Sequence, residues 1–239
     1  MIRVAVAGVR GEMGRVAVHA LRASDEFEYV GGIARVADAS EQTYASVGDL
    51  LHERTPDVLL DLTTRPASFE ISMAALAGGV RPVIGVSGWT DDERAALAHL
   101  AEERGVGAMI VPNFSTGALL MMQFAEQAAR FFADVEIVEM HRVGKKDKPS
   151  GTALQTAQCI ARGGGRRPEI HSVRLPGLVA RHEVLFGNPG ESLTIRHDSL
   201  SRESFVPGIF AALRAVMQLH GLTIGLDAIF DQMRAVPST

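Results

Sequence analysis

"IRVAVAGVRGEMGRVAVHAL", residues 2–21, carries the strongest fold signal in this chain. An apolar run over 2–7 ends at a glycine, and beyond the turn apolar residues recur at the three- and four-residue spacing of a helix. Gly8, Gly11 and Gly14 occupy the turn and the start of the helix. A strand, a glycine turn and a helix in this order are typical of a dinucleotide-binding domain, because the turn lets backbone N–H groups approach a pyrophosphate.

The alternation of strand and helix continues through the first half of the chain. Each predicted strand is almost continuously apolar, which indicates a parallel sheet covered by helices on both faces. We therefore predict an α/β fold with a doubly wound, Rossmann-type parallel sheet. The predicted strands are 2–7, 27–34, 57–63, 82–88 and 106–114, and the predicted helices begin near Met13, Pro66 and Thr90.

After Pro112 the pattern of the sequence changes. A helix is predicted over 116–132, and a strand over 135–142 ends in a histidine and an arginine. Polar and apolar residues then alternate in 191–199, and the tripeptide "NPG" joins this segment to the preceding "HEVLFG" as in a hairpin. This part of the chain predicts an antiparallel or mixed sheet.

These patterns predict two domains. Residues 1–112 are expected to form the dinucleotide-binding domain, completed by the C-terminal segment 206–239, which opens with an amphipathic helix at Pro207. Residues 113–205 are expected to form a smaller α+β domain that binds the substrate.

Charge and composition exclude several classes of partner. The chain has 24 Lys and Arg against 28 Asp and Glu, so no global field favours nucleic acid or an anionic membrane. No segment approaches the roughly 18 apolar residues of a membrane span, and the N-terminus is unlike a signal peptide. The single cysteine, Cys159, excludes an internal disulfide and a cysteine-cluster metal site. Since hydrolase and NTPase motifs are also absent, we expect a cytoplasmic protein of another class.

The end of the second predicted strand indicates which dinucleotide binds. An acidic residue there would bind ribose hydroxyls, whereas an arginine accommodates a 2′-phosphate. The sequence has Ala34 and then Arg35, which favours NADPH over NADH. Two alternatives stay open: Glu12 would oppose a phosphate if it points toward it, and Arg35 would be only an exposed strand-end residue.

A cluster of cations, "HRVGKKDKPSGTA" at 141–153, precedes a predicted helix. A helix start rich in Ser, Gly and Thr supplies hydroxyl and N–H groups that bind an anion. The cations before it would add a bidentate grip from Arg142 and a point charge from Lys145, and His141 would exchange protons. The alternative is a solvated basic loop, and the other histidines, among them His182, are assigned structural roles.

In order and spacing, several motifs resemble those of the 4-hydroxy-tetrahydrodipicolinate (dihydrodipicolinate) reductase family. The resemblance implies an NAD(P)H-dependent oxidoreductase of lysine and diaminopimelate biosynthesis that reduces a cyclic dicarboxylate with loss of water. It also implies a cytoplasmic homotetramer built through the sheets of the second domain, and no metal. The motifs are "GVRGEMG" (8–14), "DLT" (61–63), "GVSGW" (85–89), "PNFSTGA" (112–118), "EMH…K.D.PSGTA" (139–153) and "RHDSLSRESFVPG" (196–208).

The same resemblance assigns roles to individual residues. His141 would be a proton donor or acceptor and Lys145 a proton donor. Arg142, Ser150, Gly151 and Thr152 are the expected substrate-binding residues. The expected cofactor-binding residues are Gly8, Val9, Arg10, Gly11, Glu12, Met13, Arg35, Gly85, Val86, Ser87, Val111, Pro112, Asn113 and Phe114.

The chain departs from the family pattern at two positions. Arg142 stands where the family usually has a second histidine, and Val86 stands where it usually has a threonine. Arg142 leaves open a reductase or dehydrogenase of a related cyclic imine or amino acid. A non-catalytic NADPH-binding regulator is a further alternative, against which the His141 and Lys145 pair argues.

Overall fold

A computed structural model of the chain describes residues 1–230, so residues 231–239 of the predicted C-terminal segment lie outside the described residues. The chain divides into two compact units. The first unit consists of Met1–Phe114 and the segment that begins at Phe205, and the second unit of Ser115–Ser204. The cofactor-binding and substrate-binding roles expected for these parts stay predictions.

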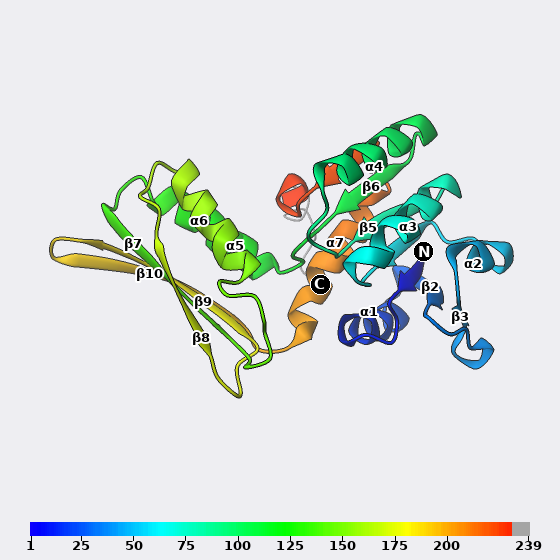
Figure 1. Ribbon diagram of the computed structural model, residues 1–239, viewed down its shortest axis with the longest axis horizontal. Helices are drawn as coiled ribbons and strands as arrows, with labels where there is room; N and C mark the ends of the chain where they lie inside the picture. Colours follow the sequence, from blue (N-terminus) through cyan, green and yellow to red (C-terminus); the bar gives the residue numbers. More distant parts are fainter. Residues whose placement is uncertain (231–239) are drawn as a thin grey trace. The chain divides into compact units, whose positions relative to one another are not determined.

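A seven-stranded sheet forms the centre of the first unit (Figure 1). Every pair of neighbouring strands in it is parallel, as the sequence predicts. In sheet order the strands are β11 (Gly221–Ile224), β6 (Gly107–Ile110), β5 (Arg81–Ile84), β4 (Val58–Asp61), β1 (Ile2–Ala7), β2 (Phe27–Ile33) and β3 (Thr43–Tyr44).

Helices cover both faces of this sheet. They are α1 (Glu12–Arg22), α2 (Val47–Glu53), α3 (Arg65–Ala77), α4 (Asp91–Arg104) and α7 (Val206–Val216). The first unit also contains the short 3₁₀ segments η1 (Ala39–Glu41) and η3 (Asp227–Ile229), and η2 (Arg202–Phe205) spans the boundary between the two units. Helices α1 and α7 contact each other in one layer, and α3 contacts both α2 and α4 in the other. The strands between the layers are therefore buried on both sides, which explains their continuous apolar runs.

The sequence pattern does not predict α2, β3 or β11. These elements are only seven, two and four residues long, too short for a periodicity to be recognised. Three predicted strands are too long by two or more residues: 57–63, 82–88 and 106–114 continue past the observed ends of β4, β5 and β6, at Asp61, Ile84 and Ile110. The extra residues form loops at the carboxyl edge of the sheet.

The second unit contains a mixed four-stranded sheet. Its order is β10 (Glu191–Ser199), β9 (Ala180–Asn188), β7 (Asp134–His141) and β8 (Glu169–Arg174), with β7 and β8 parallel and the other pairs antiparallel. The predicted "NPG" hairpin is confirmed, since Asn188 pairs with Glu191. Helices α5 (Thr116–Ala128) and α6 (Gly151–Arg162) pack on each other and on this sheet. Helix α5 ends one turn before the predicted residue 132.

Cross-strand register arranges the helix-facing side of this sheet in rows. One row is apolar and belongs to the core shared with the helices. The next row is polar, and a third row contains a histidine beside an arginine. The rows are Ile170, Ile137, Val184 and Ile195; then Ser172, Glu139, His182 and His197; then Arg174, His141, Ala180 and Ser199.

The glycine turn after β1 is closely packed against itself. Gly8 has φ of +80°, which L side chains rarely adopt. A Cβ atom built on Gly14 would lie 2.1 Å from the carbonyl oxygen of Gly8 and 2.8 Å from Cα of Val9. Both contacts are with backbone, so a side chain at either glycine would force the turn open.

We expect Gly14→Ala to lower the free energy of unfolding by about 1–3 kcal/mol, as overpacking does, although alanine is the better helix former. The matched control is Gly187→Ala in β9, where a Cβ meets nothing within 4 Å and a change within about 0.5 kcal/mol is expected. Urea unfolding of the two variants checks this. Equal stability of both would show that the turn relaxes without cost.

Candidate active site

The carboxyl ends of neighbouring strands bring predicted cofactor residues together in the first unit. Gly8 follows β1, Gly85 follows β5 and Val111 follows β6. A Cβ atom on Gly8 would lie 2.7 Å from the carbonyl oxygen of Leu62, and one on Gly85 would lie 2.7 Å from Cε2 of Phe114 and 2.8 Å from Cδ2 of Leu62. The turns after β1, β4, β5 and β6 therefore touch at the edge where open parallel sheets bind ligands.

The start of α1 in this edge has no side-chain cap. Gly11 is the N-cap residue and offers no hydroxyl or carboxylate to the second and third helical residues, Met13 and Gly14. A helix end of this kind can offer its N–H groups to a phosphate. Together with the closely packed glycines, it fits the pyrophosphate of a dinucleotide.

The predicted cofactor residues differ in exposure. Val9, Val86, Val111 and Phe114 are buried, Gly8, Met13, Gly85 and Asn113 are half-buried, and Arg10, Gly11, Glu12, Arg35, Ser87 and Pro112 are exposed. At this edge the large apolar side chains are therefore buried beneath the backbone, and most of the polar side chains are exposed to solvent.

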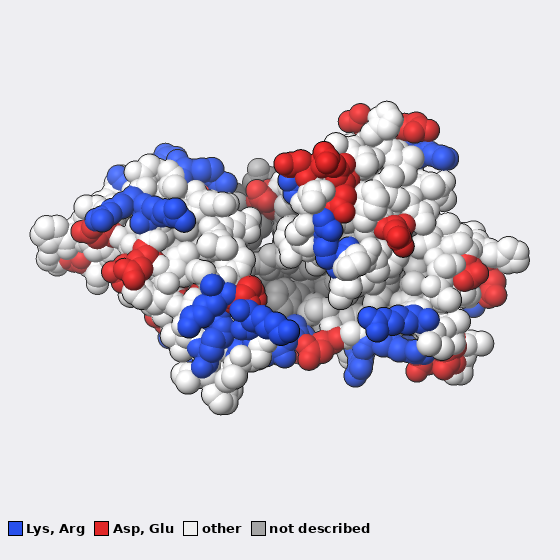
Figure 2. All heavy atoms as spheres, in the orientation of Figure 1, with Lys and Arg blue, Asp and Glu red and all other residues white. Residues whose placement is uncertain are grey.

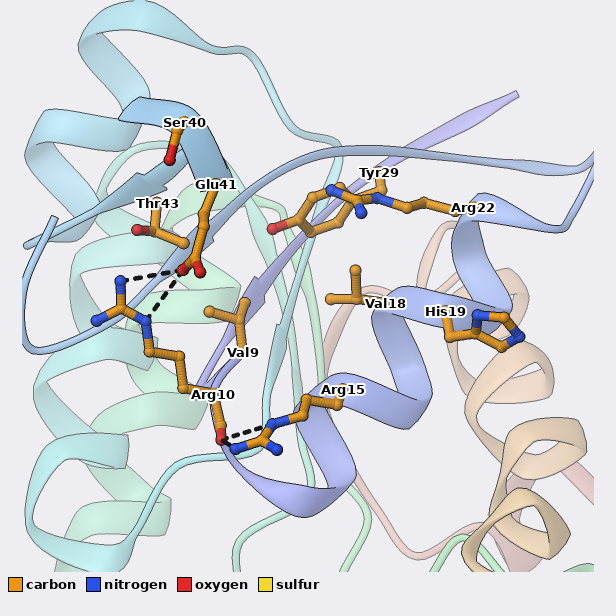
Figure 3. A pocket seen from close by; sticks show the side chains of 10 residues that line it. All are labelled: Val9, Arg10, Arg15, Val18, His19, Arg22, Tyr29, Ser40, Glu41 and Thr43. Atoms are coloured by element: carbon orange, nitrogen blue, oxygen red, sulfur yellow. Dashed lines mark hydrogen bonds and ion pairs between the residues drawn. The ribbon is translucent and has the colours of Figure 1, made fainter. Parts of the chain in front are cut away.

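A pocket of about 450 Å³ lies beside α1, next to the glycine turn (Figure 3). Three arginines line it, and two of them are held by the protein itself. The guanidinium of Arg10 donates to Glu41 at 3.0 and 3.1 Å, and Arg15 donates to the carbonyl oxygen of Arg10. Arg22 lies over the ring of Tyr29. Arg35 is not among the residues that line this pocket.

The second unit holds the predicted proton-transfer residues around a buried carboxylate. Glu139 of β7 is fully buried. Its oxygens accept hydrogen bonds from the guanidinium of Arg174 at 2.7 and 3.0 Å, and Oε2 lies 2.5 Å from Nδ1 of His141. Glu139 and His141 are two residues apart on one strand and so project from the same face. Arg174 lies beside His141 on the neighbouring strand.

These contacts shift the pKa values of both groups. Burial raises the pKa of Glu139, but hydrogen bonds from Arg174, Ser172 and His141 outweigh it, so the pKa lies below its ordinary value. Burial is the largest effect on His141 and lowers the pKa of the imidazole, while Glu139 opposes this change. His141 is therefore neutral at neutral pH, with its proton on Nδ1, which faces the carboxylate.

The loop between β7 and α6 carries the predicted proton donor. The ammonium of Lys145 lies 2.9 Å from the carboxylate of Asp147, and this hydrogen bond is the main reason that the pKa of Asp147 is lowered. Arg174 also donates a hydrogen bond, at 2.8 Å, to the carbonyl oxygen of Asp147. The arginine that neutralises Glu139 thus also anchors this loop. In Figure 2, Lys and Arg side chains gather over the region where the loop lies.

The predicted substrate residues follow at the start of α6. Ser150 is the N-cap, and its hydroxyl accepts a hydrogen bond from the N–H of Ala153 at 3.2 Å. Gly151 is exposed, Thr152 is half-buried, and a Cβ atom on Gly151 would meet nothing within 4 Å. The helix start therefore has open space beside it for an anion.

Arg142, the residue that departs from the family pattern, follows β7 directly. It is exposed, and its side chain forms no hydrogen bond or ion pair within residues 1–230. Its guanidinium is therefore available to a ligand.

Three residues of this site have no role in it that was predicted from the sequence: Glu139, Arg174 and His182. His182 is 3% exposed, lies 3.1 Å through Nε2 from the hydroxyl of Ser150, and packs edge-on against His141 with ring centroids 5.2 Å apart. The Glu-Met-His spacing at 139–141 was a usable signal for Glu139. No local signal exists for Arg174 and His182, because their contacts come from strand pairing.

Ligand atoms of Glu139, His141 and His182 lie within 4.8 Å of one another, which raises the question of a metal. Both oxygens of Glu139 already accept hydrogen bonds from Arg174, and the positive charge of that guanidinium opposes a second cation. The group therefore fits acid–base chemistry better than metal binding. The expectation of no metal stays a prediction.

We expect Glu139→Gln to lower the pKa of His141 further, because the carboxylate is the group that opposes the effect of burial. An NMR titration of the His141 ring checks this. The control is Glu136→Gln, which removes an exposed carboxylate bonded to His171 on the other face of the sheet. An unchanged His141 pKa in Glu139→Gln, or an equal change in the control, would contradict the assignment.

No helix within residues 1–230 has the length and apolar character needed to cross a membrane.

Comparison with known proteins places both units in one family. Residues 2–114 match the model "Dihydrodipicolinate reductase, N-terminus", and residues 117–230 match "Dihydrodipicolinate reductase, C-terminus". A 4-hydroxy-tetrahydrodipicolinate reductase of Geobacillus kaustophilus is 44% identical, covering 96% of this chain and 99% of its own. That of Halalkalibacterium halodurans is 45% identical, covering 97% and 100%.

A solved structure gives the same result. The dipicolinate-bound dihydrodipicolinate reductase from Paenisporosarcina sp. TG-14 is 40% identical, with a TM-score of 0.85, over 96% of this chain and 99% of that one. Its α/β architecture agrees with the parallel sheet and the second, mixed sheet described above. With both family models and near-complete coverage in agreement, this chain belongs to the dihydrodipicolinate reductase family.

Proposed function

We propose that this chain catalyses the NAD(P)H-dependent reduction of 4-hydroxy-tetrahydrodipicolinate to tetrahydrodipicolinate, with loss of water, in lysine and diaminopimelate biosynthesis. The observation that carries the proposal is the group of Glu139, Arg174 and His141, with Lys145 and the start of α6 in the same unit. It combines groups that exchange protons with a site for an anion, as a ring dicarboxylate requires.

We assign the two carboxylates of the substrate to different parts of this site. One is bound by Ser150, Gly151 and Thr152, since a helix N-terminus favours negative charge and Gly151 leaves room for it. The other is bound by Arg142, whose free guanidinium suits bidentate contact with a carboxylate.

The proton chemistry is assigned to His141 and Lys145. Because Nδ1 of His141 is held by Glu139, Nε2 is the nitrogen that exchanges a proton. Glu139 orients the imidazole and stabilises its charged form when a proton is taken up. Lys145 donates a proton once a substrate carboxylate replaces Asp147 beside the ammonium.

The dinucleotide is assigned to the carboxyl edge of the first unit, with the residues expected from sequence. When bound, it supplies the hydride that reduces the conjugated ring of the substrate. The uncapped start of α1 binds the pyrophosphate, and the turns that begin at Gly85 and Val111 line the rest of the edge.

A preference for NADPH is part of this proposal. Arg35 lies two residues beyond the end of β2 and is exposed, so it is available for a 2′-phosphate. Arg10 is less suited to this role, because it is bound by Glu41 at 3.0 Å and lies 4.0 Å from Asp38. The use of NADH then depends on how completely Glu41 and Asp38 neutralise the positive charge that the arginines present to a dinucleotide.

We further propose a cytoplasmic homotetramer. The sheet face of the second unit opposite α5 and α6 carries Val138, Met140, Val173 and Leu185 among charged residues. Leu185 is 37% exposed. An uncovered face of this kind is a candidate for pairing with a second copy. A reducing compartment agrees with the single, buried Cys159.

The reaction is tested by adding the purified chain to aspartate semialdehyde, pyruvate and the preceding synthase, and following NADPH oxidation. We expect oxidation well above the enzyme-free rate, and Lys145→Ala to lower turnover by a factor on the order of 100, as loss of a proton donor does. The matched control is Lys146→Ala, which removes a neighbouring exposed charge. No oxidation by the unaltered chain refutes the reaction, and equal turnover in both variants removes Lys145 from the mechanism.

For Arg35→Ala we expect a larger rise in KM for NADPH than for NADH, because only NADPH carries the 2′-phosphate that the guanidinium neutralises. Steady-state kinetics with each dinucleotide, at fixed substrate, measure the two changes. A parallel rise for both dinucleotides would be incompatible with a contact to the 2′-phosphate.

A further inference from the structure

Two serine–histidine pairs hold the starts of the two helices in the second unit. Ser115 caps α5 and Ser150 caps α6, each accepting a hydrogen bond from a backbone N–H in the first turn. The hydroxyl of Ser115 lies 3.3 Å from Nε2 of His197, and that of Ser150 lies 3.1 Å from Nε2 of His182. The two histidines face each other across β9 and β10. The same serine–histidine contact therefore occurs at the starts of both α5 and α6, and the start of α6 is the proposed substrate site.

The contact between Ser150 and His182 determines how the serine hydroxyl is oriented. A hydroxyl has one proton and two lone pairs, and one lone pair of Ser150 is used by the N–H of Ala153. Burial, with a smaller effect of His141, lowers the pKa of His182 to about 4, so the ring is neutral at neutral pH. In either neutral tautomer one partner donates and the other accepts, so the contact persists.

Burying His182 carries a free-energy cost, so filling space in the core does not by itself explain why a histidine stands here. It is 3% exposed, and its Nδ1 has no hydrogen-bond partner within residues 1–230. A buried polar atom without a partner is unfavourable, and an apolar side chain would avoid this penalty. The ring also packs against His141, so it connects the proton-transfer group to the helix start.

We propose that His182 is a positioning residue that holds Ser150, and through it the first turn of α6, in the conformation that binds a substrate carboxylate. This inference rests on the proposed function, because it assigns the carboxylate to Ser150, Gly151 and Thr152. His197 performs the matching task for α5, at a helix start that has no proposed contact with substrate.

The test compares His182→Leu, His182→Gln and His197→Leu. We expect His182→Leu to raise KM, and the Kd for dipicolinate measured by calorimetry, about five- to tenfold, as loss of one hydrogen bond does. Turnover should change less than about threefold. His182→Gln should restore KM, because its amide reaches the position of Nε2. His197→Leu should lower the melting temperature and leave KM unchanged.

A double-mutant cycle addresses the link through the serine. If His182 acts through Ser150, the effects of His182→Leu and Ser150→Ala on the Kd for dipicolinate combine to less than their sum. Should His182→Leu fail to fold, His182→Asn takes its place, because the shorter amide does not reach the serine. Additive effects, an unchanged KM in His182→Leu and in His182→Asn, or an equal rise in KM in His197→Leu would overturn the proposal.

The two proposals fail in distinguishable ways. Dipicolinate binding that weakens in His182→Leu, in a chain that oxidises no NADPH, supports the positioning role and refutes the proposed reaction. NADPH oxidation by a chain whose KM is unchanged in His182→Leu supports the proposed reaction and refutes the positioning role. A chain that neither reacts nor binds dipicolinate refutes both.

Discussion

The carboxylate of Glu139 has no exposed surface, and a buried charge is stable only when it is paired and hydrogen-bonded. Arg174 meets this requirement with two hydrogen bonds and His141 with a third. The same guanidinium also bonds the carbonyl oxygen of Asp147 in the loop that carries Lys145. Neutralising one buried charge thus sets the position of both proposed proton-transfer groups. Loss of Arg174 would leave the charge of Glu139 in the core without its ionic partner.

Strand register is what brings these groups together. The row that contains Ile137 and Val184 packs into the core beneath the helices, and the next row holds Glu139 opposite His182. A slip of one residue between β7 and β9 would turn His182 to the other face of the sheet. The apolar row therefore does more than stabilise the unit, because its pairing holds the polar row under the starts of α5 and α6.

The first unit works under a different constraint, the close approach of backbone to backbone. The glycine turn packs on itself and on the turn after β4, leaving an uncapped helix start at the carboxyl edge of the sheet. The arginines near this turn differ in charge balance, because Arg10 is paired with Glu41 whereas Arg35 is exposed beyond the end of β2.

The sequence alone determined the local features: the doubly wound α/β pattern, the glycine turn, a helix that opens at 149–152, and a strand that carries His141 near its end. These follow from periodicity and capping chemistry within about a dozen residues, and the family resemblance followed from motifs in order. Only the tertiary structure decided the partners. The bond from Arg174 to Glu139 and the contact of His182 with Ser150 join segments 35 and 32 residues apart. Such pairs depend on strand order and register, and these arise from the burial of side chains over the whole sheet rather than from any local pattern.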